Sequence, residues 1–249
     1  MILKNPARNL QIPQTEVKKR TAIDPEQIGL FMEYVRNSPQ YSNTYPEFLF
    51  LFNTGVRVGE MAGLTWDNID FENNMITIDK TVNRYRKADF GFTVALASPK
   101  SRTSVRTFPM NSEVRKMLLK EKFRDTAPAA PLLFVDDSGN IRRQVNNIVF
   151  SNSFGNAWNE PGFLCLINRI VEAYNQEAEK TGKKKLENFC PHMARHTYTS
   201  LAYSAGADVK AVSEILGHAS TSVTLDTYAH LTEEKKRQQE EIVKAIKVL

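Results

Sequence analysis

The chain changes its hydrophobic periodicity along its length, and this feature limits the folds that it can adopt. Apolar residues recur at helical spacing near the start, at Ile28, Phe31, Met32 and Val35, and helical stripes return in the second half. Between these parts, residues 75–78 alternate as a half-buried strand does. The sequence therefore predicts an α+β fold that is mainly helical and carries a small antiparallel β-sheet.

Turn and capping residues predict where several elements begin and end. Asp24 supplies a side-chain acceptor directly before Pro25, which is the pattern of a helix start. Residues 48–52 are apolar on every side, as in a buried helix, and Gly55 ends that helix. Further helices are predicted at 58–63, from Ser112, over 163–174, at 192–206, 208–217 and 233–249, with a short one from Ser220 or Thr221 to Tyr228. Strands are predicted at 75–78, 92–97, 104–108 and 132–135, with residues 99–102 in a hairpin connection.

Size and composition exclude several classes of protein. With 249 residues and 41% hydrophobic side chains, the chain can form one large domain with a substantial core. No apolar run reaches the roughly 18 residues of a membrane helix, so we expect no membrane association. Two cysteines are too few for a disulfide framework and fit a reducing cytosol.

The positive charge is concentrated in one part of the chain. Residues 80–124 hold twelve Lys or Arg against three Asp or Glu, whereas residues 45–79 hold one basic residue against six acidic ones. A basic segment of this density is typical of a surface that binds polyphosphate, and a solvated protein surface is the alternative.

The two ends of the chain differ from the middle. Residues 1–20 carry five basic side chains, one acidic side chain and two prolines, which predicts an extended basic linker. We expect this linker to follow an N-terminal DNA-binding domain, with a catalytic domain over residues 21–232. Residues 233–249 are predicted to form a terminal helix, and we expect its apolar stripe to pack either on its own domain or on a neighbouring subunit.

Four short segments combine residue types that suit phosphate chemistry. On a helix, His192 and Arg195 share a face, so an imidazole lies beside a guanidinium whose fork matches two phosphate oxygens. Arg57 falls between two predicted helices with Glu60 near enough to support it, and an ordinary surface ion pair is the alternative. The other segments are Ser98-Pro99-Lys100-Ser101 and Leu216-Gly217-His218, the latter with Tyr228 ten residues later.

Two other interpretations use the same residues. His192 and His196, with Cys190 nearby, have a spacing that zinc ligands use, but Met193 stands where the metalloprotease pattern needs Glu. Residues 208–217 and 221–228 could form the helix-turn-helix of a DNA-binding regulator, which leaves Arg57 and Lys100 unexplained.

Taken together and in this order, these motifs resemble the tyrosine recombinase family, also called phage-type integrases. The resemblance covers nearly all of residues 21–230 and is most specific in Thr54 to Glu60, in His192-Met-Ala-Arg195-His196-Thr, and in Leu-Gly-His218 with Tyr228. One departure is Ala194, where the family often has Leu before the second arginine. Its final region is most similar to integrases of bacterial mobile elements and phages.

The resemblance implies a catalytic set of Arg57, Lys100, His192, Arg195, His218 and Tyr228. Tyr228 would attack a DNA phosphodiester, forming a 3′-phosphotyrosyl bond and releasing a 5′-hydroxyl. The two arginines would hold the non-bridging oxygens, Lys100 would act as general acid, His192 as base or hydrogen-bond partner, and His218 as a further donor. Glu60 and His196 would support these groups, and neither a cofactor nor a metal is implied. DNA contacts are expected from Arg84, Arg86, Lys87, Arg102 and Arg106.

The resemblance also implies a partner and an assembly. We expect double-stranded DNA as the substrate and action in the bacterial cytoplasm. The chain is expected to be a tetramer on paired DNA sites and a monomer when DNA is absent. The expected function is site-specific recombination that integrates and excises a mobile element or prophage. A type IB topoisomerase, which relaxes supercoils without joining new partners, shares this chemistry and is a third interpretation.

Overall fold

The structure is a computed structural model that describes residues 22–86, 92–98, 104–124, 129–136 and 140–217. The helices in this part of the chain are α1 (Pro25–Asn37), α2 (Tyr45–Thr54), α3 (Val58–Ala62), α4 (Ser112–Lys122), α5 (Glu160–Thr181), α6 (Pro191–Ser204) and α7 (Val209–Leu216), with short 3₁₀ turns at Ser42–Thr44 and Trp66–Asn68. The strands are β1 (Ile69–Asp70), β2 (Met75–Ile78), β3 (Thr81–Arg86), β4 (Phe92–Ala97), β5 (Arg106–Pro109), β6 (Leu132–Val135) and β7 (Ile141–Val145).

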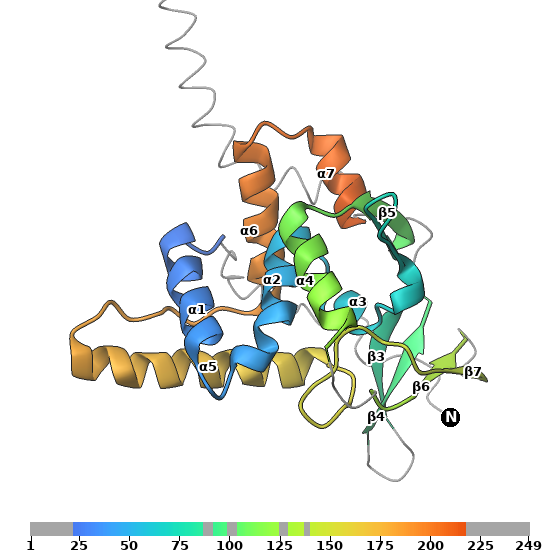
Figure 1. Ribbon diagram of the computed structural model, residues 1–249, viewed down its shortest axis with the longest axis horizontal. Helices are drawn as coiled ribbons and strands as arrows, with labels where there is room; N and C mark the ends of the chain where they lie inside the picture. Colours follow the sequence, from blue (N-terminus) through green and yellow to red (C-terminus); the bar gives the residue numbers. More distant parts are fainter. Residues whose placement is uncertain (1–21, 87–91, 99–103, 125–128, 137–139, 218–249) are drawn as a thin grey trace, which may run out of the picture.

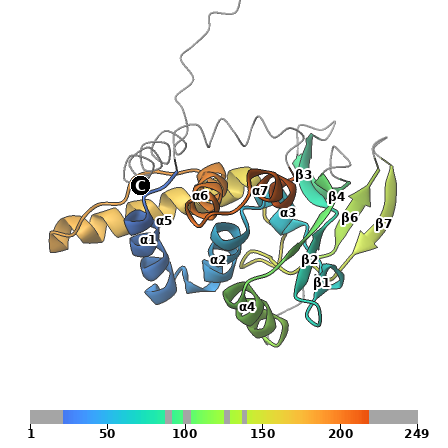
Figure 2. The ribbon, with the colours of Figure 1, turned by 90° about the horizontal axis from the view of Figure 1, so that it is seen from above.

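Helices and strands occupy different sides of the molecule. Helices α1, α2, α5 and α6 gather on one side and the strands on the other, with α3 and α7 between them (Figures 1 and 2). The strands form two sheets with the orders β1-β2-β5 and β3-β4-β6-β7. Their pairings are antiparallel except for β4 with β6, which run parallel. The predicted α+β fold is therefore confirmed, with two small sheets in place of one.

The main core lies among the helices and follows the predicted stripes. Phe31 of α1, Phe48 of α2 and Phe163 of α5 are each no more than 1% exposed. The ring centroid of Phe48 lies 4.9 Å from that of Phe31 and 5.0 Å from that of Phe163. Such aromatic contacts add to the burial of apolar area and fix how the three helices pack.

Capping residues define the helix ends as predicted. The side chain of Asp24 accepts a hydrogen bond from the backbone of Glu26 at the start of α1, and Asp208 caps α7. Gly55 ends α2 and Gly217 ends α7, both in the left-handed conformation, with φ of 64° and 66°. These two glycines bring the ends of α2 and α7 to the same region of the molecule, which is described below.

The predicted hairpin between residues 92–97 and 104–108 is wrong. The first of these segments, β4, pairs with β3 and β6, while the second, β5, pairs with β2 in the other sheet, where Ile76 lies opposite Phe108. Strands β1, β3 and β7 were not predicted. Alternation of side chains shows that a segment is extended but does not identify its partner strand, since every antiparallel neighbour satisfies the same pattern.

Several predictions concern residues outside the described ranges. These are the linker at 1–20, the residues of the connection at 99–102, the short helix ending at Tyr228 and the terminal helix at 233–249. Among the described residues, no helix is both long and apolar enough to span a membrane.

Candidate active site

Arg57 and Glu60 form the first part of the site, at the start of α3. Arg57 precedes the first residue of this helix, and its backbone N–H donates to Glu60 Oε2 at 2.9 Å. The Arg57 side chain also contacts Glu60, with Nη1 donating to Oε1 at 2.8 Å. The Glu60 side chain is only 4% exposed, whereas that of Arg57 is 39% exposed. The predicted contact is therefore present, and it differs from a surface ion pair because the carboxylate is buried.

Arg106 of β5 occupies the other side of the same carboxylate. Its Nη2 donates to Glu60 Oε2 at 2.9 Å and its Nη1 donates to Oε1 at 3.2 Å, so the guanidinium binds the carboxylate in a bidentate ion pair. The Arg106 side chain is 6% exposed. Arg106, which was predicted as a DNA contact, is therefore almost buried and paired with a carboxylate. The missed signal is the alternation of β5, in which Arg106 shares the inward face with Phe108.

The charge state of Glu60 follows from these contacts. Burial alone would raise the pKa of Glu60, because a carboxylate is less stable away from water. Hydrogen bonds and charge from Arg106, followed by those from Arg57, outweigh burial and lower that pKa. The buried carboxylate is therefore ionised at neutral pH.

Arg195 completes the site from the second turn of α6. Its Nη1 donates to the carbonyl oxygen of Gly55 at 3.0 Å, and its Nη2 donates to that of Leu216 at 2.6 Å. These carbonyls lie at the ends of α2 and α7, where a helix carries partial negative charge that favours a cation. Burial, followed by the positive charge of Arg57, lowers the pKa of Arg195 to about 9, so the group is still charged at neutral pH.

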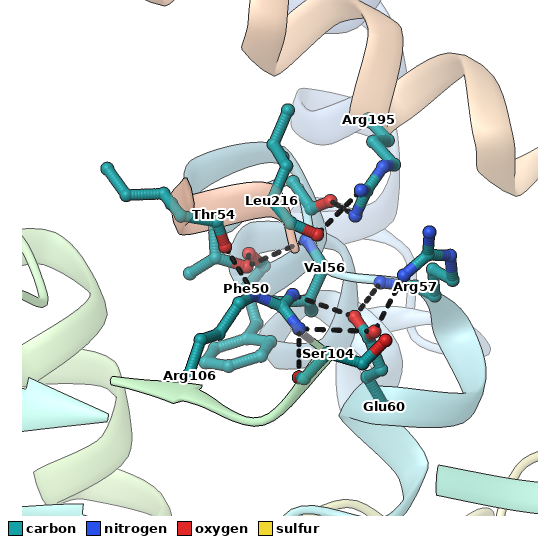
Figure 3. Close-up of polar contacts among 11 residues, drawn as sticks. Phe50, Thr54, Val56, Arg57, Glu60, Ser104, Arg106, Arg195 and Leu216 are labelled. Atoms are coloured by element: carbon teal, nitrogen blue, oxygen red, sulfur yellow. Dashed lines mark hydrogen bonds and ion pairs between the residues drawn. The ribbon is translucent and has the colours of Figure 1, made fainter. Parts of the chain in front are cut away.

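The three arginines converge although they lie far apart in the sequence. Figure 3 shows Arg57 and Arg106 approaching the Glu60 carboxylate from two sides, with Arg195 beside them and directed at the Leu216 carbonyl. The positive charges of Arg57 and Arg106 both lower the pKa of Arg195, so the three guanidinium groups lie close enough to interact electrostatically. Three guanidinium groups against one carboxylate leave a surplus of positive charge, as a site for a phosphate requires.

Two of the three predicted histidines, His192 and His196, lie on α6. His192 is in the first turn, its side chain is 42% exposed, and its Nδ1 lies 3.9 Å from Oε1 of Glu160 at the start of α5. His196 is half-buried on the same helix. In the described part of the chain, no three side chains of His, Cys, Asp or Glu group closely enough to hold a metal ion.

Other predicted residues lie outside the described ranges, namely Lys87, Lys100, Arg102, His218 and Tyr228. The residues that flank two of them contact the site. Ser104, four residues after Lys100, accepts a hydrogen bond from Arg106 at its carbonyl oxygen at 3.0 Å. His218 directly follows Gly217, at the end of the helix that Arg195 contacts.

The remaining predicted DNA contacts lie on β3. The Arg84 side chain is exposed, and its guanidinium lies over the ring of Phe92 at 3.6 Å from the centroid. Arg86 is the last residue of the same strand.

Comparison with known families agrees with this geometry. Residues 21–235 match the sequence model of the phage integrase family. The chain belongs to this family. The match spans the whole region that holds the arginine cluster and the motifs from which the resemblance was inferred.

The similar proteins include enzymes of mobile elements. The chain is 27% identical over 235 residues to the transposase from transposon Tn916 of Enterococcus faecalis, covering 90% of this chain and 54% of the relative. It is 27% identical over 239 residues to the ICEBs1 integrase of Bacillus subtilis, covering 96% of this chain and 58% of the relative. The chain thus spans about half the length of the curated relatives that it matches.

A solved structure has the same fold. The integrase of the Tn1549 transposon, in complex with transposon right end DNA, superposes with a TM-score of 0.73 at 28% sequence identity. The match covers 96% of this chain and 72% of that chain. The present chain, as a member of the phage integrase family, therefore has the catalytic-domain fold that the resemblance implied.

Proposed function

We propose that this chain is the catalytic part of a tyrosine recombinase that cleaves and rejoins DNA through a covalent bond to Tyr228. The observation that carries the proposal is the convergence of Arg57 and Arg195, from α3 and α6, around one buried carboxylate. Two guanidinium groups brought together from distant parts of a chain repel each other, and that arrangement is useful where an anion binds between them.

In this proposal the arginines bind the scissile phosphate. Arg57 is partly exposed and uses one Nη for Glu60, so other N–H groups of its fork can reach a non-bridging oxygen. The two terminal nitrogens of Arg195 donate to the carbonyl oxygens of Gly55 and Leu216, and these contacts fix the orientation of its guanidinium beside Arg57. Positive charge held in place before the reaction stabilises the pentacoordinate phosphorus, on which negative charge grows.

The remaining groups move protons. Tyr228 would form the 3′-phosphotyrosyl bond, and because a phenol has a pKa near 10 it needs a partner that takes its proton. His192 at the start of α6 is the proposed partner, with His218 as a further donor to the phosphate. Lys100 would protonate the 5′-oxygen that leaves. The phosphotyrosyl bond preserves the energy of the broken linkage, so another strand's 5′-hydroxyl can rejoin it.

The biological setting is proposed from the relatives. The names of similar proteins refer to transposons and to ICEBs1, so we propose integration and excision of a bacterial mobile element. The substrate would be double-stranded DNA in the bacterial cytoplasm, with four copies acting on paired sites. We also propose that residues 1–20 link this unit to a DNA-binding domain and that residues 233–249 pack either on this unit or on a neighbouring copy.

Two alternatives make different predictions. A helix-turn-helix regulator would bind DNA through α7 and the segment after it, without any covalent step, and would have no use for the Arg57–Glu60–Arg106 cluster. A type IB topoisomerase would form the adduct and relax supercoiled DNA as a monomer, but would not join two different sites.

A nicked suicide substrate tests the proposal. The chain is mixed with DNA whose cleaved fragment diffuses away, and covalent protein–DNA adducts are separated under denaturing conditions. We expect an adduct with the wild-type chain and none with Tyr228→Phe, while both bind the DNA with similar affinity. Binding without any adduct from the wild-type chain would favour the regulator, and joining of two differently labelled sites separates recombinase from topoisomerase.

A further inference from the structure

We propose that Arg106 is a positioning residue for strand cleavage that holds the end of α7 against the Glu60–Arg57 pair. This inference rests on the proposed function, because it concerns the same site. Arg106 was predicted as a DNA contact, and its buried position points to a different role. It acts on the reaction through Glu60 on one side and through α7 on the other.

The guanidinium of Arg106 joins three segments of the chain. Its two terminal nitrogens contact Glu60 of α3, and Nη1 also donates to the carbonyl oxygen of Ser104 at 3.0 Å. Its Nε donates to the carbonyl oxygen of Ile215, near the end of α7. A planar fork with five N–H groups can make all of these contacts at once, which an ammonium group on a flexible stem cannot.

The end of α7 is thus held by two arginines on consecutive carbonyls. Arg106 binds that of Ile215 and Arg195 binds that of Leu216. Gly217 follows in the left-handed conformation, and a Cβ at this position would lie 3.0 Å from Arg106 Nη1 and 3.1 Å from its Cδ. The chain therefore leaves α7 in direct contact with the Arg106 guanidinium, and the next residue is His218.

Arg106 does not itself contact the phosphate in this proposal. Its side chain is 6% exposed, and the carboxylate that it binds lies between it and Arg57. Its effect is to fix Glu60, which orients Arg57, and to fix the end of α7 at Ile215, three residues before His218. A displacement of about 1 Å in such groups is enough to slow a reaction about a hundredfold.

The test compares Arg106→Met and Arg106→Lys with a matched control, Lys80→Met. Lys80 is also a buried cation, 7% exposed, and donates to Asn68 at 2.8 Å and to Asp79 at 2.7 Å, neither of which belongs to the arginine cluster. Single-turnover cleavage of the suicide substrate, DNA affinity, thermal unfolding and hydrogen exchange of the backbone amides at 212–217 are measured for each variant.

We expect Arg106→Met to slow cleavage about a hundredfold while its DNA dissociation constant stays within about threefold of wild type. Arg106→Lys should stay at least about tenfold slow, because it restores the charge but not the fork. Amides at the end of α7 should exchange faster in both Arg106 variants than in Lys80→Met. Combining Arg106→Met with Glu60→Gln should slow cleavage little beyond the slower single variant, as for two residues that act together.

Three results would overturn the inference. The first is cleavage by Arg106→Met at the rate of Lys80→Met, which would leave Arg106 a purely structural role. The second is a loss of DNA affinity that accounts for the whole loss of cleavage, and the third is unchanged amide exchange at 212–217. If the wild-type chain forms no adduct at all, the proposed function fails, while amide exchange still decides whether Arg106 holds α7.

Discussion

Gly55 offers the sharpest test of how the site is built. This residue ends α2 at a φ of 64°, and its carbonyl oxygen accepts a hydrogen bond from Arg195. A Cβ at this position would lie 2.6 Å from Cδ1 of Tyr198 and 2.8 Å from Cδ2 of Leu216, closer than real Cβ atoms come. Gly55→Ala therefore introduces both backbone strain and crowding at the point where α2, α6 and α7 meet.

The size of the effect can be separated into two parts. The left-handed conformation costs a non-glycine residue about 1–2 kcal/mol, and overpacking a filled site costs about 1–3 kcal/mol more. Gly182 at the end of α5 provides the matched control, because its φ is 67° and nothing lies within 4 Å of a Cβ there. We expect a loss of about 2–5 kcal/mol for Gly55→Ala and only about 1–2 kcal/mol for Gly182→Ala.

Urea unfolding of both variants and of the wild-type chain measures these losses. The free energies of unfolding are compared only if their slope against urea concentration is the same for all three proteins. A change in the unfolded state is then not mistaken for a change in stability. Any gain from the smaller conformational freedom of unfolded alanine is common to both variants and cancels in the comparison. Gly55→Ala should also slow cleavage, because a shift of the residue 55 carbonyl displaces the Arg195 side chain that donates to it. Gly182→Ala should not slow cleavage.

Equal losses of stability in the two variants would refute the reasoning. They would mean that Tyr198 and Leu216 yield without cost, so that the end of α2 is not tightly packed on α6 and α7. Normal cleavage by a strongly destabilised Gly55→Ala variant, measured well below its unfolding temperature, would also contradict the reasoning. It would show that the packing around Gly55 does not position Arg195.

Four further outcomes are expected. Arg57→Ala and Arg195→Ala should each lower the cleavage rate at least about a hundredfold while keeping most DNA binding, and rates within about tenfold of wild type would contradict the phosphate-binding role. Lys100→Ala should regain cleavage on a substrate with a 5′-thiol leaving group, which needs no general acid, and an absence of rescue would count against that role. Arg106 and Arg57 lower the pKa of Glu60 despite its burial, so ionised Glu60 stabilises the fold above its ordinary pKa near 4.5 and this contribution is lost as the pH falls below that value. Glu60→Gln should therefore cost about 3 kcal/mol in urea unfolding at neutral pH, with a smaller deficit in acid. Burial raises the pKa of Glu47 from 4.5 to about 7, so wild-type stability should fall as the pH rises through this range, and Glu47→Gln should be more stable than wild type by about 3 kcal/mol at pH 8 but not at pH 4.

Much of the local structure could be predicted from the sequence because its causes lie within a few residues. Helix spacing, the caps at Asp24 and Asp208 and the glycines at 55 and 217 all act over one or two turns, and the structure has these elements where they were expected. The contact between Arg57 and Glu60 belongs to the same class, since the two residues are three apart at the start of one helix.

Only the tertiary structure decided which distant segments meet. Arg106 and Glu60 are 46 residues apart and Arg195 and Gly55 are 140 apart, so no periodicity in the sequence records that they touch. The strand pairing of β4 and β5 was mispredicted for the same reason, because alternation is satisfied by any partner. The sequence by itself predicted a set of candidate phosphate-binding residues. The packing of β5 against α3 and α7 decided that one of those arginines, Arg106, is held by a buried carboxylate.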